Sequence, residues 1–226
     1  TKTGDNIVVD AVAGTGKTTL ILEIAKELGS RKILQITYNK SLKFEVREKT
    51  KALSIDNLTI HTYHSLAVCY YSCTAHVDNE IKKIIINKKE PNRQIPTFDM
   101  IVIDEAQDMT LLYYQLIIKF IKDIGSPIQL LILGDYMQGL YEFKGSDIRF
   151  LTLAEMIWKD HPSLRTQQFQ KCTMKMSYRI TRQMSHFVNN AMLGEQRMDA
   201  CRDDVPVQYI RNSRFNIERI VCAEIN

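Results

Sequence analysis

The sequence lacks any apolar run long enough to cross a lipid bilayer, which excludes a protein built on membrane-spanning helices. It has only five cysteines, an odd number without regular spacing or a CxxC pair, which argues against a disulfide framework and against a zinc site. No signal peptide precedes the first strand, and no internal repeat is present. We therefore expect a reduced, intracellular protein.

Charge of one sign is not in large excess either. The 30 Lys and Arg residues oppose 26 Asp and Glu residues, and the net charge of +4 is too small to indicate a nucleic-acid partner on its own. Basic residues cluster at 40–51 and at 82–89, which without further motifs would be solvated helix faces. The 45% hydrophobic and 25% charged content is that of an ordinary globular protein, and 226 residues suffice for one core and part of a second.

Apolar, β-branched runs alternate with amphipathic helical patterns along the chain. The predicted buried strands span residues 7–9, 33–37, 58–60, 100–103 and 128–133. The predicted helices span residues 18–28, 40–51, 64–73 and 111–124. This alternation predicts an α/β fold with a doubly wound, mostly parallel sheet, in which ligands bind at the carboxyl ends of the strands.

Two changes of pattern predict the domain organisation. The Lys- and Asn-rich stretch at about 74–97 departs in composition and predicts a short insertion. A break at His161 and Pro162 suggests an approaching boundary, so we predict a first domain over residues 1–166 and the beginning of a second over 167–226. The second would contain a strand at 167–173, a helix at 181–193 and a strand at 206–210.

The segment AVAGTGKTT, residues 11–19, follows the first predicted strand and opens the first helix, as a phosphate-binding loop requires. Small residues let backbone N–H groups point at phosphate oxygens, and the helix N-terminus favours the negative charge. Lys17 would contact the β- and γ-phosphates, and the Thr18 hydroxyl would bind Mg²⁺. Ala11 departs from the motif, which has glycine there. The predicted nucleotide-binding residues are Ala13, Gly14, Thr15, Gly16, Lys17, Thr18 and Thr19.

A second motif, IVIDEAQD, is an apolar strand that ends in carboxylates. Asp104 would bind Mg²⁺, directly or through water, and Glu105 would act as the general base that polarises the attacking water. Carboxylates at a strand end can also cap the following helix. Asp108, just before the apolar helix that starts at Leu111, fits that second interpretation, whereas Asp104 and Glu105 fit the catalytic one.

Five segments of the chain, taken together with their order, resemble the motifs of the superfamily 1 DNA helicases of the UvrD and Rep type. DEAQD, LLILGDYMQGLYEFKGSD and MSYRIT are similar to their later motifs, and ILQITYNKSL and TIHTYHSL to their two DNA-side motifs. The short insertion points toward the branch that resembles F-box DNA helicases. The resemblance implies RecA-like phosphate-loop NTPase domains that bind ATP and Mg²⁺ between them. Because the glutamine motif and the last motifs are absent, we expect an incomplete chain.

The resemblance also implies roles for single residues in ATP hydrolysis. Gln138 would sense the γ-phosphate, and Tyr178 would stack on adenine. Arg179 would reach the γ-phosphate from the second domain and stabilise the transition state. With Lys17, Asp104 and Glu105, these residues make up the predicted catalytic and adenine-contacting set.

Further residues match positions that contact DNA in the family. Tyr38, Tyr141 and Phe143 would stack on bases, and Lys144 stands where arginine is commoner. Thr62 and His64 would contact the DNA backbone. The alternative for Tyr141 and Phe143 is ordinary packing of a loop.

These implications lead to two competing functions. In the first, the chain is an ATP-driven motor that moves 3′ to 5′ on single-stranded DNA and unwinds tailed duplexes. We expect such a motor to act as a monomer and to have no membrane partner. In the second, it is a truncated module that binds ATP and DNA without turnover of its own. A small-molecule kinase does not explain GDYMQ and SYRIT.

Overall fold

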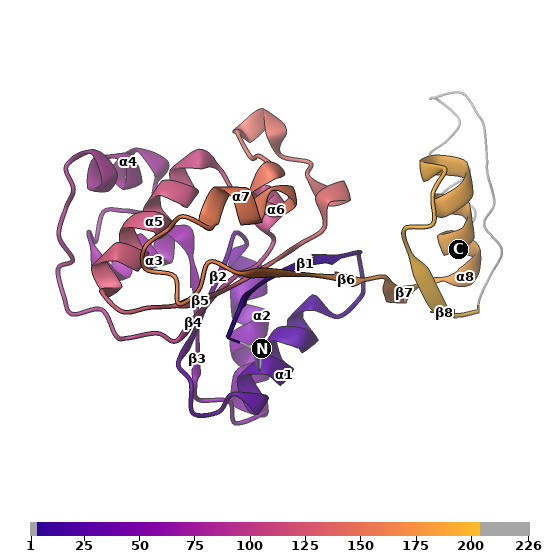
Figure 1. Cartoon of the computed structure of the whole chain (residues 1–226), viewed down its shortest axis with the longest axis horizontal. Helices are drawn as coiled ribbons and strands as arrows, with labels where there is room; N and C mark the ends of the chain where they lie inside the picture. Colours follow the sequence, from indigo (N-terminus) through magenta and orange to yellow (C-terminus); the bar gives the residue numbers. More distant parts are fainter. Residues whose placement is uncertain (1–3, 204–226) are drawn as a thin grey trace, which may run out of the picture.

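The computed structural model describes residues 4–203 and centres on one twisted parallel sheet (Figure 1). Six strands form it in the order β3-β2-β4-β5-β1-β6, and each neighbouring pair is parallel. The strands are β1 (Asn6–Ala11), β2 (Ile33–Thr37), β3 (Leu58–Thr62), β4 (Met100–Ile103), β5 (Gln129–Gly134) and β6 (Phe169–Met174). The predicted parallel α/β fold is confirmed.

Helices cover both faces of the sheet, because side chains that alternate along each strand enter two separate cores. Leu34 packs into one core and its neighbour Ile33 into the other. On the Ile33 face lie α1 (Lys17–Glu27) and α2 (Lys40–Ala52). On the Leu34 face lie α3 (Tyr63–Tyr70), α4 (Asp78–Ile86), α5 (Leu111–Ile124), α6 (Arg149–Thr152) and α7 (Ala154–Trp158). Short 3₁₀ turns span η1 (Ala106–Asp108), η2 (Tyr136–Gln138) and η3 (Glu142–Lys144).

The segment predicted as an insertion, residues 74–97, is mostly exposed but packs onto the core of the Leu34 face through a few buried side chains. It contains α4, whose Ile81 and Ile84 are buried in the same cluster as Leu116 and Phe120 of α5. Burying such aliphatic side chains stabilises the fold by about 1.5–3 kcal/mol each. The segment is therefore a structural part of this face.

The strand predicted at 167–173 is present as β6, but it joins the first sheet. It pairs with β1 along its whole length, from Asn6 with Phe169 to Ala11 with Met174. The Asn6 side chain strengthens this edge by donating from Nδ2 to the carbonyl of Thr166 at 2.7 Å. The first sheet thus extends beyond the division predicted at residue 166.

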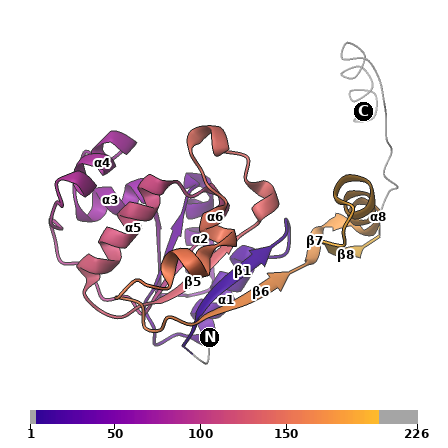
Figure 2. The same ribbon diagram turned by 45° about the horizontal axis from the view of Figure 1, so that its top comes forward.

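Beyond β6 the chain forms a small βαβ unit, the second unit, at the far end of the molecule (Figure 2). It comprises β7 (Met176–Thr181), α8 (Arg182–Phe187), the π-helix η4 (Val188–Leu193) and β8 (Asp199–Arg202), and its two strands are parallel. The predicted helix at 181–193 is therefore an α-helix that continues as a π-helix. The strand predicted at 206–210 lies outside the described residues. Within residues 4–203 no helix is long and apolar enough to cross a membrane.

Candidate nucleotide and nucleic-acid site

The phosphate loop, residues 11–18, connects β1 to α1 as the sequence predicts. Gly14 and Gly16 have φ angles of 76° and 88°, a left-handed region that residues with a Cβ rarely adopt. Gly16 is the N-cap of α1 and provides no side-chain cap, so the first amides of the helix are available to an anion. Ala11 ends β1 in extended backbone with its methyl fully buried, which explains why this position does not need glycine.

Residues from the phosphate loop, from α2 and from the DEAQD, GDYMQ and MSYRIT segments line one cavity of about 370 Å³, the nucleotide cavity. Sequence reasoning did not identify the three α2 residues among them, because nothing in an amphipathic helix marks which turn borders a ligand. The lining residues are Ala13, Gly14, Gly16, Lys17, Thr18, Thr19, Leu42, Glu45, Lys49, Glu105, Gln138, Tyr178 and Arg179.

Glu105 and Asp104 follow β4 but face different surroundings. The Glu105 carboxylate borders the nucleotide cavity, and its Oε2 lies 3.2 Å from Lys17 Nζ. Asp104 is 1% exposed, and its carboxylate accepts hydrogen bonds from Gln35 Nε2 at 2.9 Å and from the Glu105 amide at 3.0 Å. Burial, together with the nearby Glu105 charge, raises the pKa of Asp104 to about 7.

The acidic cluster suits a hard divalent cation. Burial, and then the charge of Glu105, also raise the pKa of Asp108 to about 6, and Lys17 opposes the shift at both Asp104 and Asp108. Oxygen ligands with excess negative charge are what Mg²⁺ prefers, and the Thr18 hydroxyl borders the same cavity. Glu105 and Thr18 border the nucleotide cavity, whereas Asp104 and Asp108 do not. Within residues 4–203 no group of three or more His, Cys, Asp or Glu side chains is arranged to hold a metal ion, so these residues would hold Mg²⁺ only together with the phosphates.

The interpretation of Asp108 as a helix cap is wrong. The N-cap of α5 is Thr110, whose Oγ1 accepts from the Tyr113 amide at 3.3 Å. Asp108 lies one turn earlier, in η1, and its Oδ1 is buried without a hydrogen-bond partner.

The start of β7 is fastened to the phosphate loop. The Tyr178 amide donates to the Gly14 carbonyl at 2.9 Å, and Ser177 Oγ donates to the Ala13 carbonyl at 2.8 Å. The Tyr178 side chain is 63% exposed beside the cavity, and Arg179 borders it as well. The structure thus brings both predicted residues of the MSYRIT segment to the cavity wall, although Tyr178 and Gly14 are far apart in sequence.

This close contact makes Gly14 intolerant of a side chain. A Cβ at Gly14 would lie 2.6 Å from Arg179 Cβ and 2.7 Å from Ser177 Oγ. We expect Gly14→Ala to separate β7 from the loop and to weaken nucleotide binding, measured by titration of a fluorescent ATP analogue. Gly125→Ala is the matched control, because Gly125 has a φ of 68° but nothing within 4 Å of its Cβ position. Both variants pay about 1–2 kcal/mol of left-handed strain, so equal nucleotide affinities would contradict the expectation.

The aromatic residues predicted to contact bases lie together beyond the carboxyl ends of β2 and β5. The Tyr38 and Tyr141 rings stack with centroids 6.0 Å apart at 26°. Lys144 Nζ lies 4.9 Å from the Tyr141 ring centroid and 5.5 Å from that of Phe143. Phe143 is 79% exposed, so the alternative of ordinary loop packing is wrong for this residue.

His64 continues this aromatic surface, whereas Thr62 does not. The Tyr113 ring lies between Tyr38 and His64, with its centroid 6.1 Å from that of Tyr38 and 5.8 Å from that of His64. His64 Nε2 is 3.0 Å from Asp78 Oδ1, in α4. Thr62 is buried and caps α3, since its Oγ1 accepts from the Ser65 amide at 3.2 Å. Its hydroxyl therefore serves the helix that presents His64.

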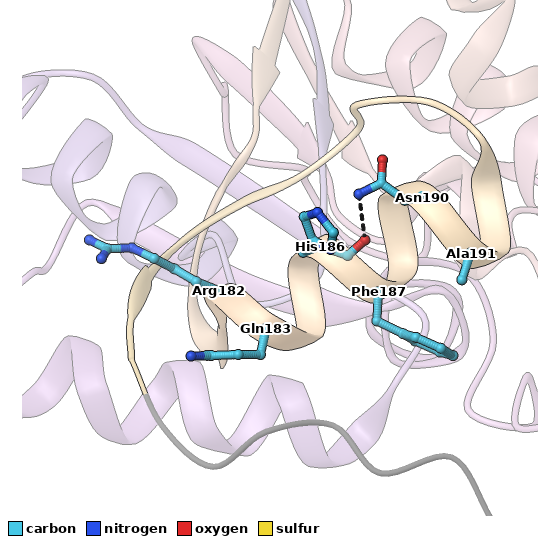
Figure 3. Close-up of a pocket in the computed structure, with 6 residues that line it drawn as sticks. All are labelled: Arg182, Gln183, His186, Phe187, Asn190 and Ala191. Carbon is cyan, nitrogen blue, oxygen red and sulfur yellow. Dashed lines mark hydrogen bonds between the residues drawn. The ribbon is translucent and has the colours of Figure 1, made fainter.

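A separate, open hollow lies along α8 and η4 (Figure 3). It shares no residue with the nucleotide cavity. Within it the Asn190 side chain donates from Nδ2 to the His186 carbonyl at 3.0 Å, which closes one turn of the helix. The lining residues are Arg182, Gln183, His186, Phe187, Asn190 and Ala191.

Residues 2–144 of the chain match the family described as AAA domain. Two curated relatives are the proteins named ATP-dependent DNA helicase UvrD1 of Mycobacterium bovis and of Mycobacterium tuberculosis. Each is 28% identical over an alignment of 140 residues, and the match covers 57% of this chain and 17% of the relative. Among solved structures, an arterivirus nonstructural protein 10 (helicase) has a TM-score of 0.47 and 11% identity, over 87% of this chain and 42% of the other.

Proposed function

The chain belongs to the AAA domain family over residues 2–144, and from this premise we propose that it is the ATP-hydrolysing part of a DNA helicase motor. The observation that carries the proposal is the nucleotide cavity, where Lys17, Glu105, Gln138 and Arg179 meet although they come from separate segments. The UvrD1 relatives, which are named as ATP-dependent DNA helicases, support the same proposal.

In this proposal the triphosphate lies on the phosphate loop. The amides at Ala13, Gly14 and Gly16 and the start of α1 bind its phosphates, with Thr19 at the edge of the cavity. The Thr15 amide, which donates to the Val12 carbonyl at 3.4 Å, would have to leave it to join them. Lys17 leaves Glu105 to bind the β- and γ-phosphates, and Tyr178 stacks on adenine. Thr18 would hold the Mg²⁺, and Asp104, which does not line the cavity, would contribute its charge from behind the cavity wall. The cation supplies charge neutralisation for the phosphates when bound.

Hydrolysis then depends on three side chains. Glu105 takes a proton from the attacking water, which general-base catalysis favours by about 10²–10⁴-fold. Arg179 stabilises the charge that develops on the transferred phosphoryl group. Gln138 hydrogen-bonds the γ-phosphate. Because Gln138 ends η2 and Phe143 lies in η3 only a few residues later, loss of the γ-phosphate can shift the aromatic surface.

Single-stranded DNA would bind along the aromatic surface formed by Tyr38, Tyr141, Phe143 and His64, of which Phe143 is the most exposed. Tyr38, Tyr141 and Phe143 offer rings to successive bases, Lys144 supplies charge to phosphates, and His64 offers a ring nitrogen to the DNA backbone. Thr62 acts indirectly, by capping the helix that carries His64. We propose movement from 3′ to 5′ by a monomer, in line with the UvrD-type resemblance.

The DNA side of the proposal is tested with Phe143→Ala. Because Phe143 is 79% exposed, the substitution removes a stacking surface without disturbing a core. Stacking contributes about 1–3 kcal/mol per base, so the affinity for a single-stranded oligonucleotide should fall about 5- to 150-fold. The control is Ile86→Ala, which removes a 76% exposed apolar side chain from α4. Equal oligonucleotide affinities for the two variants in fluorescence anisotropy would remove Phe143 from the DNA path.

A further inference from the structure

Arg197 of the second unit reaches back into the first sheet. It lies between η4 and β8, and its guanidinium binds the Asp10 carboxylate with both Nη atoms, at 2.9 and 3.0 Å. Nη2 also donates to Asp135 Oδ1 at 2.6 Å. The guanidinium carbon lies 3.8 Å from the centroid of the Tyr136 ring. One arginine thus joins the ends of β1 and β5 to the second unit.

This contact is buried and held rigidly. The Arg197 side chain is 7% exposed and that of Asp135 is 4% exposed. Asn189, itself 2% exposed, fixes the backbone, because its Oδ1 accepts from the amides of Arg197 and Met198, each at 3.1 Å. Buried ion pairs add little net stability compared with apolar packing, and their best-attested use is to specify one arrangement. The contact therefore favours one placement of the second unit.

Asp135 connects Arg197 to two residues of the nucleotide cavity, Gln138 and Glu105. Its Oδ2 accepts from Gln138 Nε2 at 2.9 Å, which orients the proposed γ-phosphate sensor. Its amide donates to Gln107 Oε1 at 3.1 Å, and Gln107 Nε2 donates to Glu105 Oε2 at 2.8 Å. A continuous chain of hydrogen bonds therefore runs from Arg197 to the proposed general base.

We propose that Arg197 is a positioning residue that sets the γ-phosphate end of the nucleotide cavity through Asp135, Gln138 and Gln107. It touches no nucleotide itself. The inference rests on the proposed function, since it assigns how the second unit controls that same cavity. ADP, which lacks the γ-phosphate, should be indifferent to Arg197, whereas ATP should not.

The test compares affinities for fluorescent ADP and for a fluorescent non-hydrolysable ATP analogue, both with Mg²⁺. In Arg197→Met the preference for the ATP analogue over ADP should fall about tenfold, the effect of losing one hydrogen bond to a charged group, while ADP affinity stays unchanged. Arg197→Lys keeps the charge but not the two-pronged geometry, and should lose part of the preference. The matched control is Arg182→Met, because Arg182 forms an exposed ion pair with Asp203 in the same unit.

The outcomes separate this inference from the proposed function. Lys17→Ala should lose both nucleotides, and if the wild-type chain binds neither, the proposed function fails and the inference with it. If the wild type binds both and a folded Arg197→Met chain keeps the full preference, the inference is overturned and the function stands. A wild type without any preference also overturns it. If a thermal melt shows that Arg197→Met does not fold, the preference for the ATP analogue is measured in Arg197→Lys and Asp10→Asn instead. The Asp10 side chain is 27% exposed, so losing its charge should disturb the fold less. Full preference in both variants would overturn the inference.

Discussion

A Lys17→Ala variant is expected to hydrolyse ATP about 1,000-fold more slowly than the wild type, because it loses a fixed charge at the transferred phosphate. Lys17 Nζ lies 3.2 Å from Glu105 Oε2, so the substitution also leaves that carboxylate without its counter-charge. The negative charge of Glu105 would then repel the triphosphate. Both effects act in the same direction, and nucleotide binding should fall together with hydrolysis.

The matched control for Lys17→Ala is Lys26→Ala on the same helix. The Lys26 side chain is 39% exposed and pairs with Glu23 at 2.8 Å, an exposed ion pair whose loss costs about 0–1 kcal/mol. ATP hydrolysis by the two variants is measured by phosphate release, and fluorescent nucleotide titration reports binding. If Lys17→Ala hydrolyses ATP as fast as Lys26→Ala, the phosphate loop does not hold the nucleotide.

A Glu105→Gln variant is expected to separate binding from hydrolysis. The amide keeps the size of the side chain and can still accept from Gln107 Nε2, which now donates to Glu105 Oε2 at 2.8 Å. It cannot take a proton from water, so hydrolysis should slow by about 1,000-fold while ATP affinity is retained. Single-turnover hydrolysis and equilibrium nucleotide binding, measured on the same preparation, check the two halves of this expectation.

Glu45→Gln is the control for Glu105→Gln. Glu45 borders the same cavity, but its side chain is 53% exposed and pairs with Lys49 on α2. The Glu45→Gln substitution should leave the ATP hydrolysis rate unchanged. Equal rates for Glu105→Gln and the wild type would mean that another group activates the water, and a parallel loss of binding would make Glu105 a structural residue. A chain that binds ATP and never hydrolyses it, even with every residue intact, would instead be a binding module.

The sequence predicted the strands and the phosphate loop because their patterns are local. A buried parallel strand such as β2 reads as a continuous apolar run, and the GTGKT segment needs only its neighbours to form the turn into α1. The position of β6 was not predictable in this way. Its residues indicate a strand, but which sheet a strand joins depends on partners such as Asn6, which are far away in sequence.

The same distinction applies to the site. Lys17, Glu105, Gln138 and Arg179 were identified from motif resemblance, and the structure brings them to one cavity. Arg197 carries no local signal, because its importance arises only when the second unit folds against Asp10 and Asp135. The caps of α3 and α5 are local, since Thr62 Oγ1 and Thr110 Oγ1 each accept from the amide three residues further on. They were missed because several polar residues stand near each helix start and compete for the same amide.

The most direct test of the central claim is the steady-state ATP hydrolysis rate of the chain with and without single-stranded DNA, at saturating ATP and Mg²⁺. If the nucleotide cavity and the aromatic surface belong to one motor, DNA should raise the rate, and Phe143→Ala should reduce that increase without changing the DNA-free rate. ATP hydrolysis that proceeds equally fast with and without DNA would contradict the coupling of the nucleotide cavity to the aromatic surface.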